Sequence, residues 1–326
     1  MEPKVSICVP VYKAEDYIER CSRSIFEQTL QDIEIIFIND CSPDRSWAIL
    51  KSIIEEYPHR KSQIKLIENP ENVGPGVSRQ KCAKVANGAF IYFADSDDWL
   101  EPSMLERMYE VATKNKADIV GCQVNIIPRS GKPFRSNYRT DLSKEEWISN
   151  MILMPDLSIS IALWTRMIRR NIYERTIVGE DTIKDLVRFE DFLNVVKCHY
   201  YSNKIVWIED PLYNHDWSNL GSVTKKKDKR AFDSYIRQAY ALEIFFHEKD
   251  VNLYDSEISI FKTRAKNQYI TNVDFFDPSK WRDLWPELNK NKNVSRKQRI
   301  MMWLASHKFD SLLYVLVKLY HKRRGI

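Results

Sequence analysis

Several features that would assign a protein class are missing from this sequence. No uninterrupted apolar run reaches 18 residues, so no transmembrane helix is predicted. The six cysteines include no Cys-x-x-Cys pair and no metal-ligand spacing, which argues against a structural zinc site. No export signal precedes the first apolar run, so these scattered thiols predict a cytoplasmic protein in a reducing compartment. Glycine is scarce, with 8 residues, whereas 9 tryptophans and 16 tyrosines indicate a rigid scaffold with aromatic-rich surfaces.

Composition and charge divide the chain into two parts. Apolar residues make up 44% of the 326 residues, which supports a sizeable core and excludes a disordered chain, a collagen-like fibre and a disulfide miniprotein. The formal net charge of +5 is unevenly spread, because residues 221–326 contain 22 lysines and arginines against 12 aspartates and glutamates. With the basic run Lys225–Arg230 as a boundary, we expect one domain at residues 1–224 and a basic helical module at residues 225–326.

Short apolar runs alternate with helical periodicity over the first 125 residues. This alternation predicts an α/β fold, with a Rossmann-like, mostly parallel sheet covered by helices on both faces. The expected strands are Val5–Pro10, Ile33–Asn39, Ile64–Asn69, Phe90–Asp95 and Ile119–Val124, with helices near residues 15–29, 44–57, 76–87 and 102–115. Further along, we expect helices at Ser143–Met154 and Phe189–Tyr200, a strand at Lys204–Ile208, and only helices beyond residue 230.

Polar motifs follow the first four of these strands. In parallel sheets, ligands bind outside the carboxyl ends of the strands, so we expect these motifs to line one site. They are Pro10–Glu15, Asn39–Asp44, Asn72–Gly76 with Arg79, and Asp95–Asp98. No Gly-x-Gly-x-x-Gly follows the first strand, which argues against a dinucleotide-binding site.

Asp95 and Asp97 leave an apolar strand two residues apart, so their carboxylates should project to the same side. Such a pair can hold a hard divalent cation while leaving coordination positions for phosphate and water. The same segment, followed by Trp99 and Pro102, also fits a capped turn before a helix. The two interpretations are compatible if Asp98 serves the turn and Asp97 the cation.

The other strand ends offer contacts for a nucleoside diphosphate. Arg79 supplies forked donors suited to phosphate, next to a glycine loop at a helix N-terminus. Asp40 can accept the imide N–H of a uracil ring, and Tyr12 can stack on that ring. Each has an ordinary alternative, with Arg79 as a solvated helix residue and Asp40 as part of a helix-capping loop.

Taken in order, these motifs resemble the family-2 inverting glycosyltransferases of the GT-A fold, of the bacterial surface-polysaccharide type. The matching residues are Pro10-x-Tyr12-x-x-Glu15, Asn39-Asp40-x-Ser42-x-Asp44, Asn72-x-Gly74 with Arg79, Phe93-x-Asp95-x-Asp97-Asp98 and Glu190-Asp191. The resemblance covers about residues 3–224 and closes with Ile205–Tyr213 and His215. Lys13 and Gln80 stand where asparagine is usual, which affects individual contacts rather than the class.

The resemblance implies transfer of a sugar from a nucleoside-diphosphate donor to a hydroxyl of a polysaccharide or lipid-linked oligosaccharide, with Asp40 favouring a UDP-sugar. It assigns Asp191 as general base with Glu190 beside it, and Asp97 and Asp95 as ligands of Mg²⁺ or Mn²⁺, with His215 as a further candidate ligand. The nucleotide-binding residues that it implies are Pro10, Val11, Tyr12, Glu15, Asp40, Asn72, Arg79, Asp95 and Ser96.

The assignments of Asp191 and His215 have alternatives, and the role of Trp99 is also open. Asp181, in the pair Glu180-Asp181, is a rival base, although its spacing to Tyr213 is too long for the family pattern. His215 is also consistent with a hydrogen-bonded structural histidine. Trp99 either stacks on a sugar ring or packs beneath the acidic motif.

The segment Arg296–Ile326 carries 8 lysines and arginines and only Asp310 as an acidic residue. Together with its many apolar residues, this predicts contact with an anionic membrane surface on the inner face of the cell membrane; the alternative is an ordinary helical subdomain. Two rival functions stay open: a non-catalytic sugar-nucleotide- or membrane-binding protein, and a nucleic-acid-binding protein. The acidic strand ends argue against the latter, so no nucleic acid partner is expected.

Overall fold

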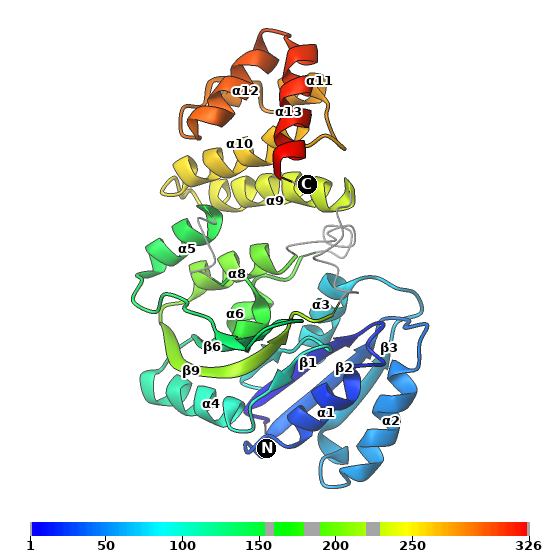
Figure 1. Ribbon diagram of the computed structural model, residues 1–326. Helices are drawn as coiled ribbons and strands as arrows, with labels where there is room; N and C mark the ends of the chain where they lie inside the picture. Colours follow the sequence, from blue (N-terminus) through cyan, green and yellow to red (C-terminus); the bar gives the residue numbers. More distant parts are fainter. Residues whose placement is uncertain (1, 154–159, 179–189, 220–228, 325–326) are drawn as a thin grey trace. The chain divides into compact units, whose positions relative to one another are not determined.

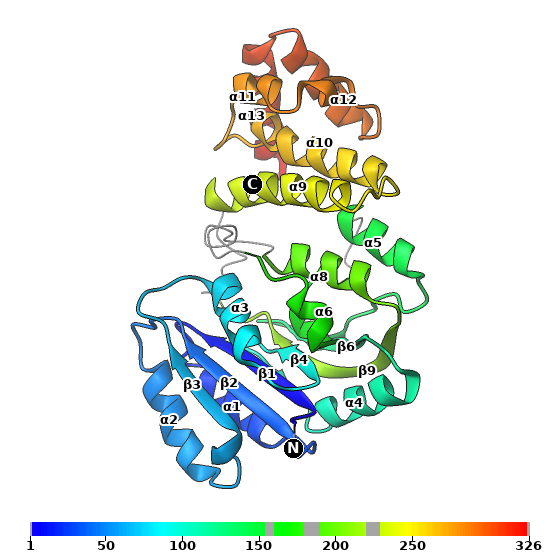
Figure 2. The same cartoon turned by 180° about the vertical axis from the view of Figure 1, so that it is seen from behind.

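The structure is a computed structural model that describes residues 2–153, 160–178, 190–219 and 229–324. The chain folds into two compact units, Met1–Lys226 and Lys227–Ile326. Figures 1 and 2 show the ribbon from opposite sides. The pair Glu180-Asp181, predicted as a rival base, lies outside the described residues.

A mixed sheet of nine strands forms the centre of the first unit, in the order β3-β2-β1-β4-β8-β6-β9-β5, with β7 paired to β6. Its strands are β1 (Val5–Val11), β2 (Ile33–Asn39), β3 (Ile64–Glu68), β4 (Phe90–Phe93), β5 (Trp99–Leu100), β6 (Ile119–Ile127), β7 (Phe134–Arg135), β8 (Arg166–Arg169) and β9 (Ile205–Asp216). The pairings among β1, β2, β3 and β4 are parallel, and so is the pairing of β6 with β9. The remaining pairings are antiparallel, so the mostly parallel sheet that we predicted is present only in the first half.

Helices cover both faces of the parallel half, which explains why β1, β2 and β4 are apolar and buried along almost their whole length. Helices α1 (Ile18–Phe26) and α2 (Ser46–Glu56) lie on one face and α3 (Pro75–Val85) on the other (Figures 1 and 2). The other helices of the unit are α4 (Met104–Asn115), α5 (Lys144–Leu153), α6 (Arg170–Glu174) and α8 (Glu190–Tyr201). Helix α4 packs on β6 and β9, and α6 packs on α3 and α8.

The predicted strands and helices of the first 125 residues are confirmed, with end shifts of a few residues. Strands β5, β7 and β8 and helix α6 were not predicted, because runs of two to five residues show no clear periodicity. Strand β9 continues well beyond the predicted Lys204–Ile208. Its register against β6 shifts on either side of the Gln123↔Pro211 pair, so a bulge interrupts the alternation that would have shown its full length.

The second unit is all-helical, as predicted. Its elements are α9 (Lys229–His247), α10 (Asp255–Thr271), α11 (Pro278–Asp283), the 3₁₀ turn η4 (Pro286–Lys290), α12 (Arg296–Ser306) and α13 (Asp310–Arg324). A capping box between Ser295 and Gln298 starts α12, and Trp281 is fully buried in an apolar cluster that α10, α12 and α13 also line. No helix in the described part of the chain has the length and apolar content of a membrane span.

Candidate active site

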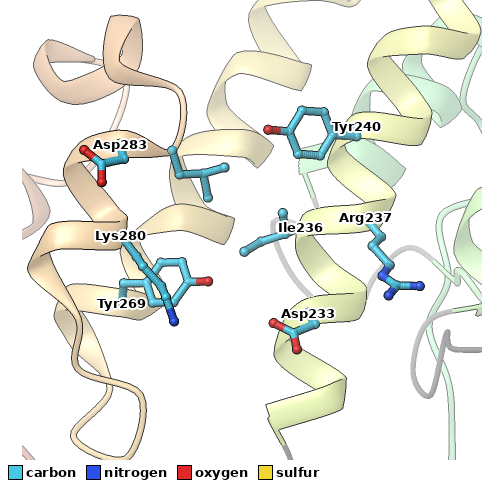
Figure 3. Close-up of a pocket in the computed structure, with 8 residues that line it drawn as sticks. Asp233, Ile236, Arg237, Tyr240, Tyr269, Lys280 and Asp283 are labelled. Carbon is cyan, nitrogen blue, oxygen red and sulfur yellow. The ribbon is translucent and has the colours of Figure 1, made fainter.

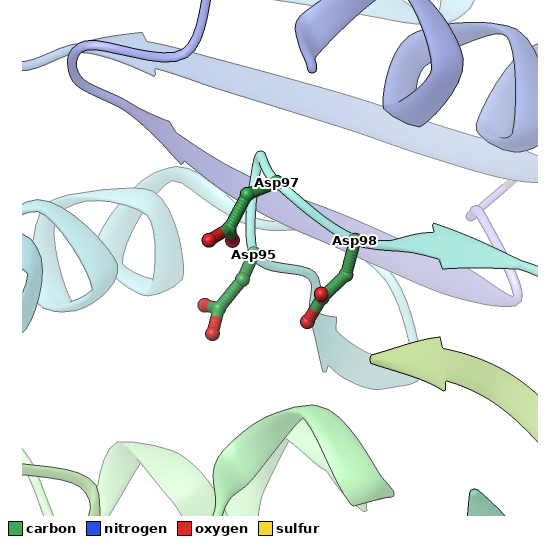
Figure 4. A group of neighbouring side chains, drawn as sticks. All are labelled: Asp95, Asp97 and Asp98. Atoms are coloured by element: carbon green, nitrogen blue, oxygen red, sulfur yellow. The ribbon is translucent and has the colours of Figure 1, made fainter. Parts of the chain in front are cut away.

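The acidic turn, defined as Asp95–Asp98, follows β4 at the carboxyl edge of the sheet. The Asp98 N–H donates to the Asp95 carbonyl at 3.2 Å and closes the turn, with Ser96 and Asp97 between them. Carboxylate oxygens of Asp95, Asp97 and Asp98 lie within 4.8 Å of one another. Figure 4 shows the carboxylates of Asp95 and Asp97 side by side. The structure therefore brings together the pair that the two-residue spacing predicted.

Asp98 anchors this turn to the end of β9. Its fully buried carboxylate accepts hydrogen bonds from the Tyr213 hydroxyl at 2.7 Å, His215 Nδ1 at 3.0 Å and the Asp216 N–H at 2.8 Å. Burial raises the pKa of Asp98, although the bond from His215 opposes the shift. Burial lowers the pKa of His215, but the hydrogen bond to Asp98 and the charges of Asp98, Asp95 and Asp97 together outweigh burial, so the net shift is upward. Because its oxygens are already engaged, Asp98 serves the turn, and Nε2 is the nitrogen of His215 that remains for a ligand role.

Asp97 lies in an unfavourable electrostatic environment, buried beside two other carboxylates. Burial, followed by the charges of Asp98 and Asp95, raises its pKa to about 7, while a hydrogen bond from Asn219 at 2.9 Å opposes the shift. A divalent cation would relieve this repulsion, and carboxylate oxygens are the ligands that Mg²⁺ and Mn²⁺ prefer. The residues present therefore fit such a cation, with Asp97 and Asp95 as the candidate ligands.

Arg79 joins the acidic turn to the predicted base. Its guanidinium, which is 7% exposed, donates to Asp95 Oδ1 at 2.7 Å through one terminal nitrogen and to Asp191 Oδ1 at 2.8 Å through the other. Arg79 sits on the second turn of α3 and Asp191 is the second residue of α8, so two helices far apart in sequence aim at the end of β4. The alternative of a solvated helix arginine is therefore wrong.

Asp191, the predicted base, is a largely buried carboxylate. Its side chain is 16% exposed, and Oδ2 accepts from the Leu163 N–H at 3.3 Å. Burial raises its pKa, while the Arg79 charge opposes the shift. A carboxylate with a raised pKa holds a proton more readily than an exposed one. Glu190 is the first residue of α8, and its side chain lies outside the described residues.

The loops after β1 and β2 are hydrogen-bonded to each other. The Lys13 N–H donates to Ser42 Oγ at 2.8 Å, the Glu15 N–H to Asp44 Oδ2 at 3.1 Å, and the Arg45 N–H back to Glu15 Oε2 at 2.9 Å. Lys13 has a φ of 52°, a left-handed backbone conformation that asparagine adopts more readily than lysine does. This explains why the family pattern usually has asparagine at this position. These contacts fix the loop on which Tyr12 lies, 41% exposed.

Asp40 organises the loop after β3. It is 2% exposed, and it accepts from the N–H groups of Val73 at 3.0 Å and Gly74 at 2.9 Å and from Asn69 Nδ2 at 2.9 Å. Asn72 donates to the Asp40 carbonyl at 3.2 Å. Pro10 and Val11 lie beside this loop at the end of β1, where the Val11 carbonyl accepts from the Asp40 N–H at 2.9 Å. The predicted nucleotide-binding residues of three strand ends thus form one connected edge.

Sequence reasoning missed two contributors to the site. The Trp164 ring stacks on Tyr213 and on His215, with centroids 4.8 and 4.7 Å apart, and nothing in its local sequence marks it. Arg20, on α1, donates to Asp216 at 2.6 Å, and its guanidinium lies 3.8 Å from the centroid of the Trp99 ring. This contact covers one face of Trp99 and favours the packing role that was one of its two expected roles.

A separate cavity of about 510 Å³ lies in the second unit (Figure 3). Helices α9, α10 and α11 supply most of its lining, which is Asp233, Ile236, Arg237, Tyr240, Tyr269, Lys280, Asp283 and Leu284. None of these residues was predicted as a site residue. Its carboxylates stand apart on different helices, so the candidate active site is the one at the carboxyl edge of the sheet.

The curled α/β sheet, the acidic turn at its edge and the arginine that joins two carboxylates define a class, the glycosyltransferases of the GT-A fold. More specifically, the chain belongs to Glycosyl transferase family 2, which matches residues 6–177. Glycosyltransferase EpsJ of Bacillus subtilis (strain 168) is 31% identical over 266 residues, which cover 78% of this chain and 75% of EpsJ.

Solved structures agree on the fold. S. aureus TarS 1-349 in complex with UDP has a TM-score of 0.68 at 20% identity, covering 99% of this chain and 92% of that chain. Mannosyltransferase PcManGT from Pyrobaculum calidifontis, in complex with GDP-Man and Mn²⁺, has a TM-score of 0.52 at 13% identity, covering 98% and 87%. At these identities the likeness shows the fold alone.

Proposed function

We propose that this glycosyltransferase is inverting and metal-dependent, and that it moves a sugar from a UDP-sugar to a hydroxyl of a polysaccharide or lipid-linked oligosaccharide. Residues 1–224 would carry the catalytic site and residues 225–326 a basic helical module. The observation that carries the proposal is the line Asp97–Asp95–Arg79–Asp191, in which neighbouring carboxylates and one arginine lie in contact. In the proposal, Asp97 and Asp95 are the cation ligands, Arg79 is the phosphate donor and Asp191 is the base.

The chemistry of the transfer needs charge stabilisation on the leaving diphosphate. Asp97 and Asp95 would hold Mg²⁺ or Mn²⁺, which when bound neutralises charge on that leaving group. Arg79 would stabilise the same charge through its forked donors, which are already fixed by two carboxylates. Asp191 would take the proton from the acceptor hydroxyl, and one displacement from the face opposite the diphosphate inverts the anomeric carbon.

A uridine nucleotide suits the edge built by the first three strands. In the proposal, Asp40 contacts the base, Tyr12 offers a stacking face, and Pro10, Val11 and Glu15 line the base and ribose. Asn72 and Ser96 complete the nucleotide contacts. The complexes of TarS with UDP and with UDP-GlcNAc support this choice of donor class by fold likeness.

Calorimetric titration with UDP and GDP, each with and without Mn²⁺, tests the donor. We expect binding of UDP that strengthens with Mn²⁺ and weak binding of GDP. Preference for GDP would overturn the assignment of Asp40, and absence of binding to either nucleotide would favour a non-catalytic protein of the same fold, which is the alternative function. A turnover assay with UDP-sugars separates that alternative from an active enzyme.

Asp191→Asn tests the base. The substitution keeps the shape of the side chain but removes its basicity, so we expect UDP affinity to stay within about threefold while transfer falls about 10²–10⁴-fold. Glu209→Gln, at an exposed carboxylate of the same unit (67% exposed), is the matched control. Retained transfer by Asp191→Asn would remove Asp191 as the base.

We also propose that the second unit touches an anionic membrane surface through α12 and α13, which would place a cytoplasmic enzyme next to lipid-linked acceptors. Leu313 and Val317 of α13 are buried, yet apolar side chains also face outward on α12, on α13 and at Phe309 between them. Those exposed side chains are Ile300, Trp303, Phe309, Leu312, Val315, Leu316 and Leu319, between 42% and 54% exposed. Basic residues surround them in this segment, so both the apolar and the charge terms of membrane attraction are present.

Vesicle flotation tests this proposal. We expect the double variant Leu312→Ser with Leu319→Ser to bind vesicles that contain phosphatidylserine several-fold more weakly than the wild type. Leu253→Ser, at a position that is 64% exposed outside this segment, is the control. Equal binding of wild type and double variant would reject the membrane role.

A further inference from the structure

A row of aromatic rings leads away from the acidic turn. His215, which is bonded to Asp98, lies edge-to-face with Trp217, with ring centroids 6.2 Å apart. Trp217 in turn lies edge-to-face with Phe134, at 5.7 Å. Trp164 stacks on His215 from another segment of the chain, at 4.7 Å. We call Trp164, His215, Trp217 and Phe134 the aromatic row.

Strand geometry explains why these rings share one side. Tyr213 and His215 at the end of β9 and Trp217, one residue beyond it, alternate along the chain, so their side chains project to the same face. In the register of the sheet, Ile126 of β6 pairs with His215 on one side and with Phe134 of β7 on the other. The row therefore lies on the same face of the sheet that presents Tyr213 and His215 to Asp98.

The outer end of the row is open to solvent. Phe134 is 49% exposed and Trp217 is 42% exposed, whereas Tyr213, which stacks on the Trp164 ring of the row, is fully buried. Large aromatic side chains are costly to expose, and a contiguous exposed pair beside a polar site marks a binding surface more often than an isolated one does. The exposed rings follow directly from His215, so the surface is continuous with the candidate active site.

We infer that Trp217 and Phe134 form an acceptor subsite that stacks on the pyranose rings of a glycan chain. A pyranose presents a flat face of C–H groups bordered by hydroxyls, which an aromatic ring covers while the hydroxyls stay in water. The two rings meet edge-to-face, with centroids 5.7 Å apart and planes at 76°, so one ring can stack on a sugar face while the other lies against the edge of the same or the next sugar. This inference deepens the proposed function and rests on it, because the chain would be held with its acceptor hydroxyl toward Asp191.

Saturation-transfer NMR and titration with two neutral probes, cellohexaose and chitohexaose, test the subsite. We expect the wild type to bind at least one probe, with saturation transferred from the protein to the C–H protons of the pyranose rings. Trp217→Leu and Phe134→Leu keep apolar area but remove the aromatic face, so we expect each to weaken binding about tenfold. Trp217→Phe should retain most of the affinity. Tyr240→Leu, at a 41% exposed tyrosine of the second unit, should not change it.

UDP titration with Mn²⁺ on the same samples keeps the two proposals distinguishable. UDP binding to every variant would support the donor assignment whatever the glycan probes do. The subsite is overturned if neither hexasaccharide binds the wild type, or if the leucine variants bind the hexasaccharides as well as the wild type does. If UDP binds to none of them, the proposed function has failed irrespective of the aromatic row. Unchanged urea midpoints confirm that a loss of binding is not a loss of folding.

Discussion

Replacing Asp97 by asparagine provides a quantitative test of the acidic turn. Without a cation, the pKa of Asp97 is raised from an ordinary 3.8 to about 7, first by burial and then by Asp98 and Asp95. A carboxyl with a raised pKa binds its proton more tightly in the folded protein than in the unfolded chain. The free energy of unfolding therefore falls as the pH rises from about 4 to about 7 and is level above that.

The magnitude follows from the shift. A pKa shift of about three units corresponds to at most about 4 kcal/mol. The free energy of unfolding of the metal-free protein should fall by up to that amount between pH 4 and pH 7. Asp97→Asn carries no charge at either pH, so it removes this loss and should be more stable than the wild type at pH 8. Saturating Mn²⁺ should stabilise the wild type at pH 8 by binding the ionised carboxylates, and this stabilisation should be absent in Asp97→Asn.

Urea unfolding followed by tryptophan fluorescence, in EDTA at pH 5 and pH 8, measures the effect as the difference between wild type and variant. Titrating groups far from the turn are common to both proteins and cancel in that difference, whereas Asp98 interacts with Asp97 and its altered titration is part of the measured effect. Asp141→Asn, at a side chain that is 75% exposed, serves as the control and should show no such difference. An equal pH dependence in wild type and Asp97→Asn would refute the electrostatic reasoning.

Three further substitutions probe the surrounding structure. Asp98→Asn places an amide where the buried carboxylate accepts three hydrogen bonds, so we expect a loss of about 2–4 kcal/mol in urea unfolding; a loss below about 0.5 kcal/mol would contradict the anchoring role. Arg79→Met removes the guanidinium that pairs with Asp95 and Asp191. We expect UDP affinity, measured by calorimetry, to fall at least about tenfold. An unchanged affinity would remove Arg79 from the donor site. Gly88→Ala adds a Cβ that would lie 2.5 Å from the Ser6 backbone nitrogen, so the melting temperature should drop by an amount equivalent to about 1–3 kcal/mol; an unchanged value would show that the close approach is relieved.

The sequence was sufficient to predict the parallel half of the sheet and the edge where the site lies. Strand β2 is buried at every position and apolar at all but Glu34 and Asn39, so its limits could be read directly as Ile33–Asn39. The carboxyl ends of parallel strands must meet at one edge, and this topological rule placed Asp40, Arg79 and Asp95 together before any coordinates.

What the sequence could not show depends on contacts between distant segments. Trp164 touches Tyr213 and His215 only because the segment after α5 returns to the sheet, and a lone tryptophan in Ala162–Thr165 has no periodic signal. Strand β8 is four residues long and gains its identity from its antiparallel neighbours β4 and β6. The different roles of Asp98 and Asp97 likewise depend on a distant segment, because Asp98 accepts its hydrogen bonds from Tyr213, His215 and Asp216.

The bonds of Asp98 also constrain the order in which the first unit can mature during synthesis. The three donors that Asp98 accepts from lie 115 to 118 residues further along the chain. A nascent chain that has emerged only to the end of β6 can pair β1 to β4, yet its acidic turn still lacks every one of these donors. Domains fold from the N-terminus as they leave the ribosome. The acidic turn must therefore stay hydrated until Asp216 has emerged, so the burial of the Asp98 carboxylate follows the pairing of β1 to β4.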